Sequence, residues 1–286
     1  METVKASPYL FDCVSAGVDW ITCTARGKEA RTGLEMASDG LLQKEAGRGV
    51  EITPARLRDY AGYQTKGIIS ARRADDSICV LKGANALADW QTVAQHATNV
   101  SRLDLQATVW THGEQPALSR WYYQRVRRLP PQRGRPRSFS LIQTHPHGDT
   151  LYVGKRQSDS FGRVYDYSVA HKKGPPRTLW RFEVEYKRHL AAHHANSLLG
   201  KRVHTSDSEQ IVHNWFGSRG VRPAWSPDQS SHLENVLPSK TTSSAMLWFE
   251  TSVSKTIARE IRRNGVAAVI EALHLSQYVI VKPQRR

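Results

Sequence analysis

One stretch of strictly alternating residues, 101–110 (SRLDLQATVW), limits the possible folds more than any other part of the sequence. Alternation with a period of two is typical of a β-strand that has one buried face and one open face. The apolar face consists of Leu103, Leu105, Ala107 and Val109, and the polar face of Arg102, Asp104, Gln106 and Thr108. The sequence therefore predicts a sheet with one face in a core and one polar face.

Strand-like runs and amphipathic helices are mixed along the first two thirds of the chain. Enrichment in β-branched and aromatic residues predicts strands at 13–24, in two runs of 62–82 joined by a hairpin tip at 72–76, and at 138–143, 150–155, 161–166 and 178–187. Apolar spacing and end signals predict helices at 29–45, 84–94 and 115–128. The hairpin-like spacing of the later strands predicts an α+β fold with a mainly antiparallel sheet.

A change of composition near residue 200 predicts a domain boundary. Residues 218–242 are polar and contain prolines, which is typical of a linker or long loop. Helices are expected beyond it at 246–261 and 266–273. The chain is thus expected to consist of a first domain, residues 1–200, and a small, mainly helical C-terminal subdomain, residues 201–286.

The charge balance favours a polyanionic partner. The chain has 41 Lys and Arg against 26 Asp and Glu, a formal net charge of +15. Such an excess concentrates polyanions near a protein, so nucleic acid is the first partner to consider. Binding to an acidic membrane surface, without nucleic acid, is the alternative.

The cysteines and the hydropathy indicate a cytoplasmic protein without a membrane partner. Cys13, Cys23 and Cys79 are odd in number and lack C-x-x-C spacing, so neither a disulfide framework nor a structural zinc site is expected. No segment approaches the roughly 18 apolar residues that a membrane helix requires.

Residues 120–137 (RWYYQRVRRLPPQRGRPR) combine arginines with aromatic side chains. Guanidinium groups neutralise phosphates while aromatic rings stack on bases, the combination that holds single-stranded DNA. The alternative is a solvated loop whose aromatic residues pack in the core. DNA contacts are predicted for Arg127, Arg128, Arg133 and Arg135.

Two histidine pairs give only weak signals for a metal site. In His145-Pro146-His147 the proline removes a ladder hydrogen bond and, with the following Gly-Asp, indicates a turn rather than a central strand. His193 and His194 are expected on the surface of a helix.

Three short motifs follow one another within residues 148–188. They are Tyr-x-Gly-x-Arg, Arg-x-Tyr-Asp and Trp-Arg-x-Glu. Their residues are Tyr152, Gly154 and Arg156 with Ser158 after them, then Arg163, Tyr165 and Asp166, and then Trp180, Arg181 and Glu183. With these motifs the chain resembles the replication initiation factor family. That family includes initiators of rolling-circle plasmids, filamentous-phage replication proteins and some relaxases of conjugative elements.

The resemblance extends over most of the chain. It includes residues 18–20 (VDW), 100–104 (VSRLD), 247–250 (LWFE), 265 and 271–273 (EAL). One departure concerns Tyr167, which stands where the family commonly has a basic residue after its Tyr-Asp pair. The basic auxiliary residue of the family is therefore not assigned here.

The resemblance implies that the first domain binds an origin and nicks one DNA strand there. Tyr165 would attack the scissile phosphate with Arg163 beside it, leaving a 5′-phosphotyrosyl link and a free 3′-hydroxyl. A tyrosine oxygen is a capable nucleophile once deprotonated, and the phosphotyrosine keeps the bond energy for rejoining. The alternative for Tyr165 is an aromatic strand residue packed for stability.

The same chemistry requires positive charge on the non-bridging phosphate oxygens, from arginines and a divalent ion. Two or three carboxylates on neighbouring strands can hold Mg²⁺ or Mn²⁺ without a histidine. Asp104 and Glu183 are the expected ligands, with Asp19 and Glu185 in reserve. The alternative is that these carboxylates only pair with arginines on an open sheet face.

Strand alternation predicts which side chains share a face. One face is expected to include Arg163, Tyr165 and Tyr167, and the facing strand Arg181, Glu183 and Glu185. Nucleophile, charge clamp and metal ligands would then converge over one sheet. Further DNA contacts are expected from Lys155, Arg156 and Arg181.

The expected partners are origin DNA with an exposed single-stranded segment, a host helicase and polymerase, and a second copy of the chain. Two other functions stay open. One is a conjugative relaxase with the same chemistry, and the other is a non-catalytic DNA-binding repressor on the same fold.

Overall fold

The computed structural model describes residues 11–111, 118–131, 137–144, 148–171, 179–199, 205–223 and 225. The strands are β1 (Phe11–Arg26), β2 (Thr53–Leu57), β3 (Tyr60–Gln64), β4 (Ile68–Arg73), β5 (Asp76–Lys82), β6 (Asn99–Thr111), β7 (Phe139–Thr144), β8 (Gly148–Val153), β9 (Ser160–Asp166) and β10 (Leu179–Lys187). The helices are α1 (Lys28–Ala46), α2 (Ala84–Ala94), α3 (Leu118–Val126), α4 (Tyr167–His171), α5 (Arg188–Leu198) and α6 (Thr205–Gly217).

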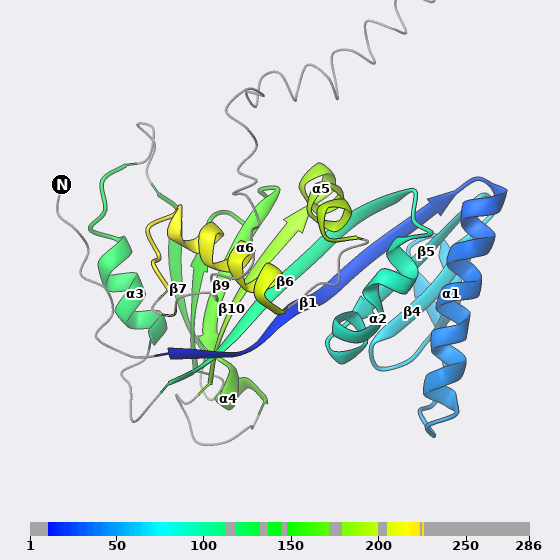
Figure 1. Cartoon of the computed structure of the whole chain (residues 1–286), viewed down its shortest axis with the longest axis horizontal. Helices are drawn as coiled ribbons and strands as arrows, with labels where there is room; N and C mark the ends of the chain where they lie inside the picture. Colours follow the sequence, from blue (N-terminus) through cyan, green and yellow to red (C-terminus); the bar gives the residue numbers. More distant parts are fainter. Residues whose placement is uncertain are drawn as a thin grey trace, which may run out of the picture. The chain divides into compact units, whose positions relative to one another are not determined.

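The strands form one sheet in the order β2-β3-β4-β5-β1-β6-β10-β9-β8-β7 (Figure 1). Every neighbouring pair is antiparallel. The long strands β1 and β6 pair along most of their length and join the two halves of the sheet. The prediction of an α+β fold with a mainly antiparallel sheet is therefore confirmed.

The alternation of β6 is also found in the structure. Its four apolar side chains are fully buried in the core. On the same side of β10, Phe182 contacts Phe216 of α6, with ring centroids 5.3 Å apart. Helices α5 and α6 thus cover the apolar side of β6 and β10, and the polar residues of these strands lie on the other side.

In the other half of the sheet, α1 and α2 pack on β1 and β5, and α1 also on β4. Polar side chains contribute to this contact. Ser38 of α1 lies 2.8 Å from Ser70 of β4, and Ser77 of β5 donates a 2.6 Å hydrogen bond to Glu35. These buried hydroxyls are satisfied by partners on the facing element, as buried polar groups must be.

A bulge in β1 places two residues of the polar face. The register with β6 shifts between Val18 and Trp20, so Asp19 is the additional residue. An extra residue bends a strand and redirects the side chains around it. Trp20 therefore stands opposite Asp104 on the polar side.

Some elements were not predicted. The hairpin β2–β3 contains Pro54 and lacks an Asn-Gly or Asp-Gly turn, with Arg58 instead taking a positive φ of 56°.

Helix α4 begins at Tyr167, so the expectation that this residue continues strand β9 is wrong. The side chain of Asp166 accepts a 3.2 Å hydrogen bond from the N–H of Val169, as a helix-capping residue does, and the strand ends there.

The predicted division of the chain at residue 200 stays a prediction. All described residues fall in one compact unit, Met1–His232, and α6 packs on β1, β6 and β10. The predicted helices at 246–261 and 266–273, the turn at 145–147 and most of the predicted linker lie outside the described residues. None of the helices that the structure describes is long and apolar enough to span a bilayer.

Candidate active site

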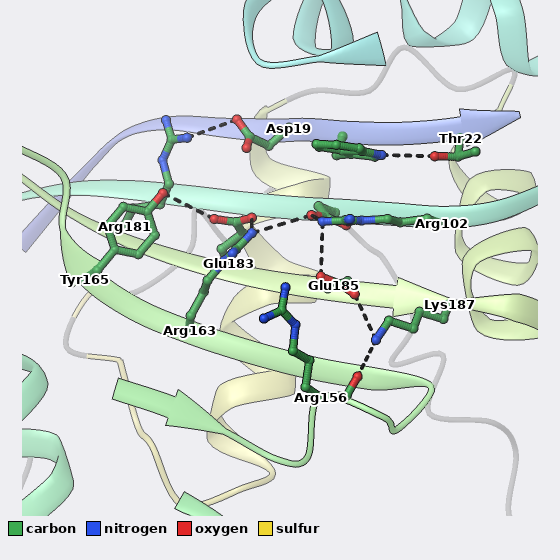
Figure 2. A network of polar contacts seen from close by, with 12 residues as sticks. Asp19, Thr22, Arg102, Arg156, Arg163, Tyr165, Arg181, Glu183, Glu185 and Lys187 are labelled. Atoms are coloured by element: carbon green, nitrogen blue, oxygen red, sulfur yellow. Dashed lines mark hydrogen bonds and ion pairs between the residues drawn. The ribbon is translucent and has the colours of Figure 1, made fainter. Parts of the chain in front are cut away.

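The polar face of the sheet brings side chains from β6, β9 and β10 together. In the register, Tyr165 stands opposite Arg181 and Arg163 opposite Glu183, while Glu185 stands opposite Asp104. Directly opposed residues point to the same side of an antiparallel sheet. Figure 2 shows Arg163, Tyr165, Glu183 and Glu185 on this side of the sheet, within one network of polar contacts.

Glu183 is the residue that connects the predicted nucleophile with the predicted charge clamp. Its Oε2 accepts a 3.3 Å hydrogen bond from the hydroxyl of Tyr165, and its Oε1 forms an ion pair with Nη2 of Arg163. The same Arg163 nitrogen lies 3.7 Å from Oδ2 of Asp104. Arg163 therefore bridges the two carboxylates that the sequence suggested as metal ligands.

The environment holds Tyr165 in its protonated form. Burial raises the pKa of Tyr165 well above its ordinary value, and the charge of Glu183 raises it further. Arg181 and Arg163 act in the opposite direction but do not compensate. Tyr165 is therefore a neutral phenol in this structure.

Asp104 is almost completely buried and is held by Arg102. Nε and Nη2 of Arg102 donate hydrogen bonds of 2.8 and 2.6 Å to the two carboxylate oxygens. Burial nevertheless raises the pKa of Asp104 to about 7, and the nearby charges of Glu183 and Glu185 act in the same direction. Arg102 also lies 3.1 Å from Oε2 of Glu185.

Arg181 is fixed in place by three groups. Its Nη1 donates a 3.0 Å hydrogen bond to Asp19, its Nε donates one of 3.1 Å to Thr108, and its guanidinium carbon lies 3.9 Å from the ring centroid of Tyr167. Tyr167 therefore lies in the same region as Tyr165 although it belongs to α4. The ring of Tyr167 also stacks on the ring of His171, with the two ring centroids 4.0 Å apart.

Part of this network lines a cleft of about 1030 Å³. Arg163, Tyr165, Tyr167, Arg181 and Glu183 lie on its walls. The opposite wall comes from β1, β5 and the turn before β4, and contributes Trp20, Lys66 and Lys82. Trp20 belongs to a stretch that the resemblance included, but no local pattern in the sequence marked these three residues as part of a site.

Carboxylate oxygens, such as those of Asp104 and Glu183, are the ligands that Mg²⁺ and Mn²⁺ prefer in proteins. Asp104 and Glu183 approach each other closely enough to share Arg163. In the described ranges, however, no group of three or more His, Cys, Asp or Glu side chains is placed to hold a metal. Mg²⁺ can bind through one or two carboxylates and complete its shell with water and substrate phosphate. In this structure Glu183 lines the cleft, whereas Asp104 is buried behind it and binds Arg102 through both carboxylate oxygens.

The other predicted DNA-binding residues are spread over the surface. Lys155 and Arg156 are exposed in the turn between β8 and β9, where Lys187 binds the backbone oxygen of Arg156 (Figure 2). Arg127 and Arg128 are exposed just after α3, a helix that packs on β7, β8 and β9. Arg133 and Arg135 lie outside the described residues.

Both predicted histidines lie on a helix, but His194 is less exposed than expected. His193 is exposed on α5, but the ring of His194 packs at 4.1 Å from that of the buried Tyr186. Burial lowers the pKa of His194 to about 4. His194 therefore belongs to the packing between α5 and β10, away from the polar face.

Comparison of the chain with models of protein families and with curated protein sequences gives no match. Among solved structures, it is similar to the rolling circle replication initiator protein from Geobacillus stearothermophilus. The two superpose with a TM-score of 0.52 and are 16% identical in sequence; the match covers 71% of this chain and 84% of that chain. The likeness at this identity is one of fold.

Proposed function

We propose that this chain is a rolling-circle replication initiator that nicks one DNA strand at an origin, with Tyr165 as nucleophile. The observation that supports this most directly is the convergence of the Tyr165 hydroxyl, the Glu183 carboxylate and the guanidinium groups of Arg163 and Arg181 in one cleft. The fold shared with a rolling circle initiator and the net charge of +15 agree with it. Of the three motifs that resemble the replication initiation factor family, the first lies on β8 and the turn after it, and the other two lie on β9 and β10.

In the proposed reaction, the oxygen of Tyr165 attacks the scissile phosphorus and the bond to the 3′ oxygen breaks. Glu183 is the acceptor of the phenol proton because its Oε2 already accepts the hydrogen bond. The departing 3′ oxygen takes a proton from water, which leaves a 3′-hydroxyl and a 5′-phosphotyrosyl link. The 3′-hydroxyl would then prime synthesis by a host polymerase, and a host helicase would separate the strands.

The positive groups of the cleft would stabilise the charge on the non-bridging phosphate oxygens. Arg163 and Arg181 both line the cleft; Arg181 stands opposite Tyr165 in the register, and Arg163 lies two residues before Tyr165 on β9. Asp104 and Glu183 are the residues that would hold a divalent ion, with Asp19 and Glu185 nearby. When bound, such an ion supplies further positive charge to the phosphate.

The test is capture of the covalent intermediate on single-stranded DNA. The full chain is incubated with Mn²⁺ and a library of random-sequence oligonucleotides, and adducts are isolated on a denaturing gel and sequenced. We expect adducts with a shared sequence next to the linkage, which identifies the origin. Tyr165→Phe removes only the hydroxyl, so it should abolish the adduct and leave DNA binding unchanged.

Tyr167→Phe is the matched control, because Tyr167 lies in the same cleft two residues away. This variant should still form the adduct. An adduct with Tyr165→Phe but not with Tyr167→Phe would move the nucleophile to Tyr167. Adducts that survive both changes would overturn the assignment to this cleft.

Metal dependence is tested in the same assay. Excess chelator should stop adduct formation, and Mg²⁺ or Mn²⁺ should restore it. Glu183→Gln should lower the rate by about 10²-fold or more, since it removes both the proton acceptor and a ligand, while changing DNA affinity little. Full activity in chelator would rule out the metal role of Asp104 and Glu183.

Two rival functions give different outcomes. A relaxase forms the same adduct, but the DNA sequence it selects would support mobilisation of a plasmid rather than its replication. A repressor on the same fold would bind DNA, form no adduct and leave a supercoiled plasmid unchanged.

A further inference from the structure

The wall of the cleft opposite Tyr165 has an excess of positive charge that the protein itself does not neutralise. Among the described residues, the charged side chains that line the cleft are four Lys and Arg and two acids. Both acids are in ion pairs, Asp19 with Arg181 and Glu183 with Arg163. The two remaining cations are Lys66 and Lys82.

Neither lysine has an ion-pair partner within the part of the chain that the structure describes. Lys66 lies in the turn between β3 and β4, and Lys82 ends β5. The backbone N–H of Lys82 donates a 2.8 Å hydrogen bond to Gly67, so the two lysines are held on neighbouring segments. Two ammonium groups without a carboxylate at the edge of a cleft are suited to an anionic ligand such as a phosphate.

Between these lysines and the nucleophile lies a half-buried indole. Trp20 is flanked from both neighbouring strands: the ammonium of Lys82 on β5 lies 4.3 Å from its ring centroid, and the guanidinium carbon of Arg102 on β6 lies 4.2 Å from it. The indole N–H donates to Thr22 at 3.0 Å, which fixes the orientation of the ring.

The two cations on the indole differ in how firmly they are held. Arg102 is held over the ring by its ion pairs with Asp104 and Glu185. The ammonium of Lys82 lies over the ring and has no ion pair or side-chain hydrogen bond in the described part of the chain, so it can exchange the ring for a phosphate. A base could then stack on the part of the indole that Lys82 covers, because base–aromatic stacking depends little on the identity of the base.

The same wall also has exposed apolar side chains. Val14 and Leu87 are 56% and 47% exposed, and both line the cleft. Exposed apolar side chains inside a charged cleft are suited to the flat, partly apolar faces of nucleobases.

From these observations we infer that Trp20, Lys66 and Lys82 form a nucleotide subsite, which stacks one base of the single strand and binds its phosphate next to the scissile position. Trp20 and the lysines thus position the substrate and take no part in the chemical step. The inference rests on the proposed function, because it assigns the single strand to the cleft of Tyr165.

The test measures binding alone, in the Tyr165→Phe background, so that it does not depend on cleavage. The probes are a 12-nucleotide dT strand and an abasic strand of equal length, with the same phosphates and no bases. Trp20→Leu keeps an apolar side chain but removes the aromatic face. It should weaken binding of the dT strand about tenfold, the size expected for one stacked base, and leave binding of the abasic strand unchanged.

Removal of the lysines should weaken binding of both the dT strand and the abasic strand. Lys66→Ala with Lys82→Ala should weaken both strands and reduce the slope of log affinity against log salt by about 1.4, at roughly 0.7 per phosphate contact on a single strand. Tyr63→Ala and Lys28→Ala are the controls, since these residues do not line the cleft. Both should bind like the parent.

Trp20→Phe provides a check against misfolding. It keeps an aromatic ring and should retain part of the preference for the dT strand, with an unchanged thermal transition. Equal binding of the dT strand by parent and Trp20→Leu, or no binding of either strand by the parent, would overturn the subsite. The proposed function is tested separately by the adduct assay on the chain with Tyr165 unchanged, because adduct formation does not depend on the role inferred for Trp20.

Discussion

The negative charge of Glu183 has two opposite effects on the proposed chemistry. One carboxylate oxygen accepts the hydrogen bond of Tyr165, and the other is in an ion pair with Arg163. The charge that makes Glu183 a proton acceptor also raises the pKa of Tyr165. In the free protein Tyr165 therefore stays a phenol, and in the proposed reaction its proton would leave only when positive charge and phosphate are in place.

His194 gives a prediction about stability at acidic pH. Its pKa is about 4 in the folded chain, because burial against Tyr186 disfavours the charged ring, whereas the ordinary value is 6.5. As the pH falls from 6.5 to 4, the unfolded chain binds a proton that the folded chain does not. The free energy of unfolding should therefore fall across this window, by about 3 kcal/mol from this residue.

Replacement of His194 with Phe keeps a ring against Tyr186 but removes the titration. Urea unfolding at pH 7, 5.5 and 4 should show a smaller loss of stability in this variant than in the parent. His189→Gln is the control, since His189 is an exposed residue on the same helix. An equal loss in parent and His194→Phe would contradict the buried, neutral histidine.

At the scale of elements, the contact of α6 with β9 depends on a glycine. A Cβ atom at Gly162 would lie 2.4 Å from an atom of Trp215 and 3.0 Å from one of Phe216. Gly162→Ala should therefore destabilise the chain by roughly 1–3 kcal/mol, since a packed interior resists an added methyl group. The measurement is the free energy of unfolding in urea, followed by circular dichroism.

Gly40→Ala is the matched control for this prediction. Gly40 lies in α1, is exposed, and a Cβ there would meet nothing within 4 Å. This variant should be as stable as the parent or more stable by up to about 1 kcal/mol, because alanine favours a helix over glycine. If the two variants were equally stable, Trp215 and Phe216 would not lie against Gly162 as the structure places them.

The sequence predicted those elements whose local pattern agrees with their burial. Strand β6 alternates strictly, and β9 and β10 include motifs that fixed which side chains share a face. The hairpin β2–β3 was missed because proline and arginines interrupt its pattern. Tyr167 was placed on the strand because the period of two continues past Asp166, although the capping side chain of that residue starts a helix.

The cleft itself was only half predictable. One wall comes from side chains of β9, α4 and β10, which are close in sequence and include two of the motifs. The other wall depends on the pairing of β1 with β5 and β6, which brings Trp20 opposite both Lys82 and Asp104. Such long-range pairing, and a bulge at Asp19, leave no local signal in the sequence.

At the scale of the whole molecule, one antiparallel sheet supplies both the proposed chemistry and the surface around it. Its polar face forms the cleft, α5 and α6 cover the apolar side of β6 and β10, and α3 places Arg127 and Arg128 beside β7 and β8. A net charge of +15 distributed over such a surface should attract DNA before the specific contacts form.

This attraction predicts a steep salt dependence, to which Arg127 and Arg128 should contribute. Each phosphate that an arginine neutralises releases counterions, so log affinity falls with log salt in proportion to the number of contacts. Arg127→Ala with Arg128→Ala should reduce the slope for a duplex origin fragment by about 1.8, at roughly 0.9 per contact on double-stranded DNA. The slope is measured by fluorescence anisotropy between 50 and 200 mM salt, roughly the range over which this effect is large.

Arg48→Ala is the control, because Arg48 is an exposed arginine after α1 that pairs with Glu45. If both variants kept the parent slope, the segment after α3 would be a solvated surface, and the DNA would have to follow another path to the cleft.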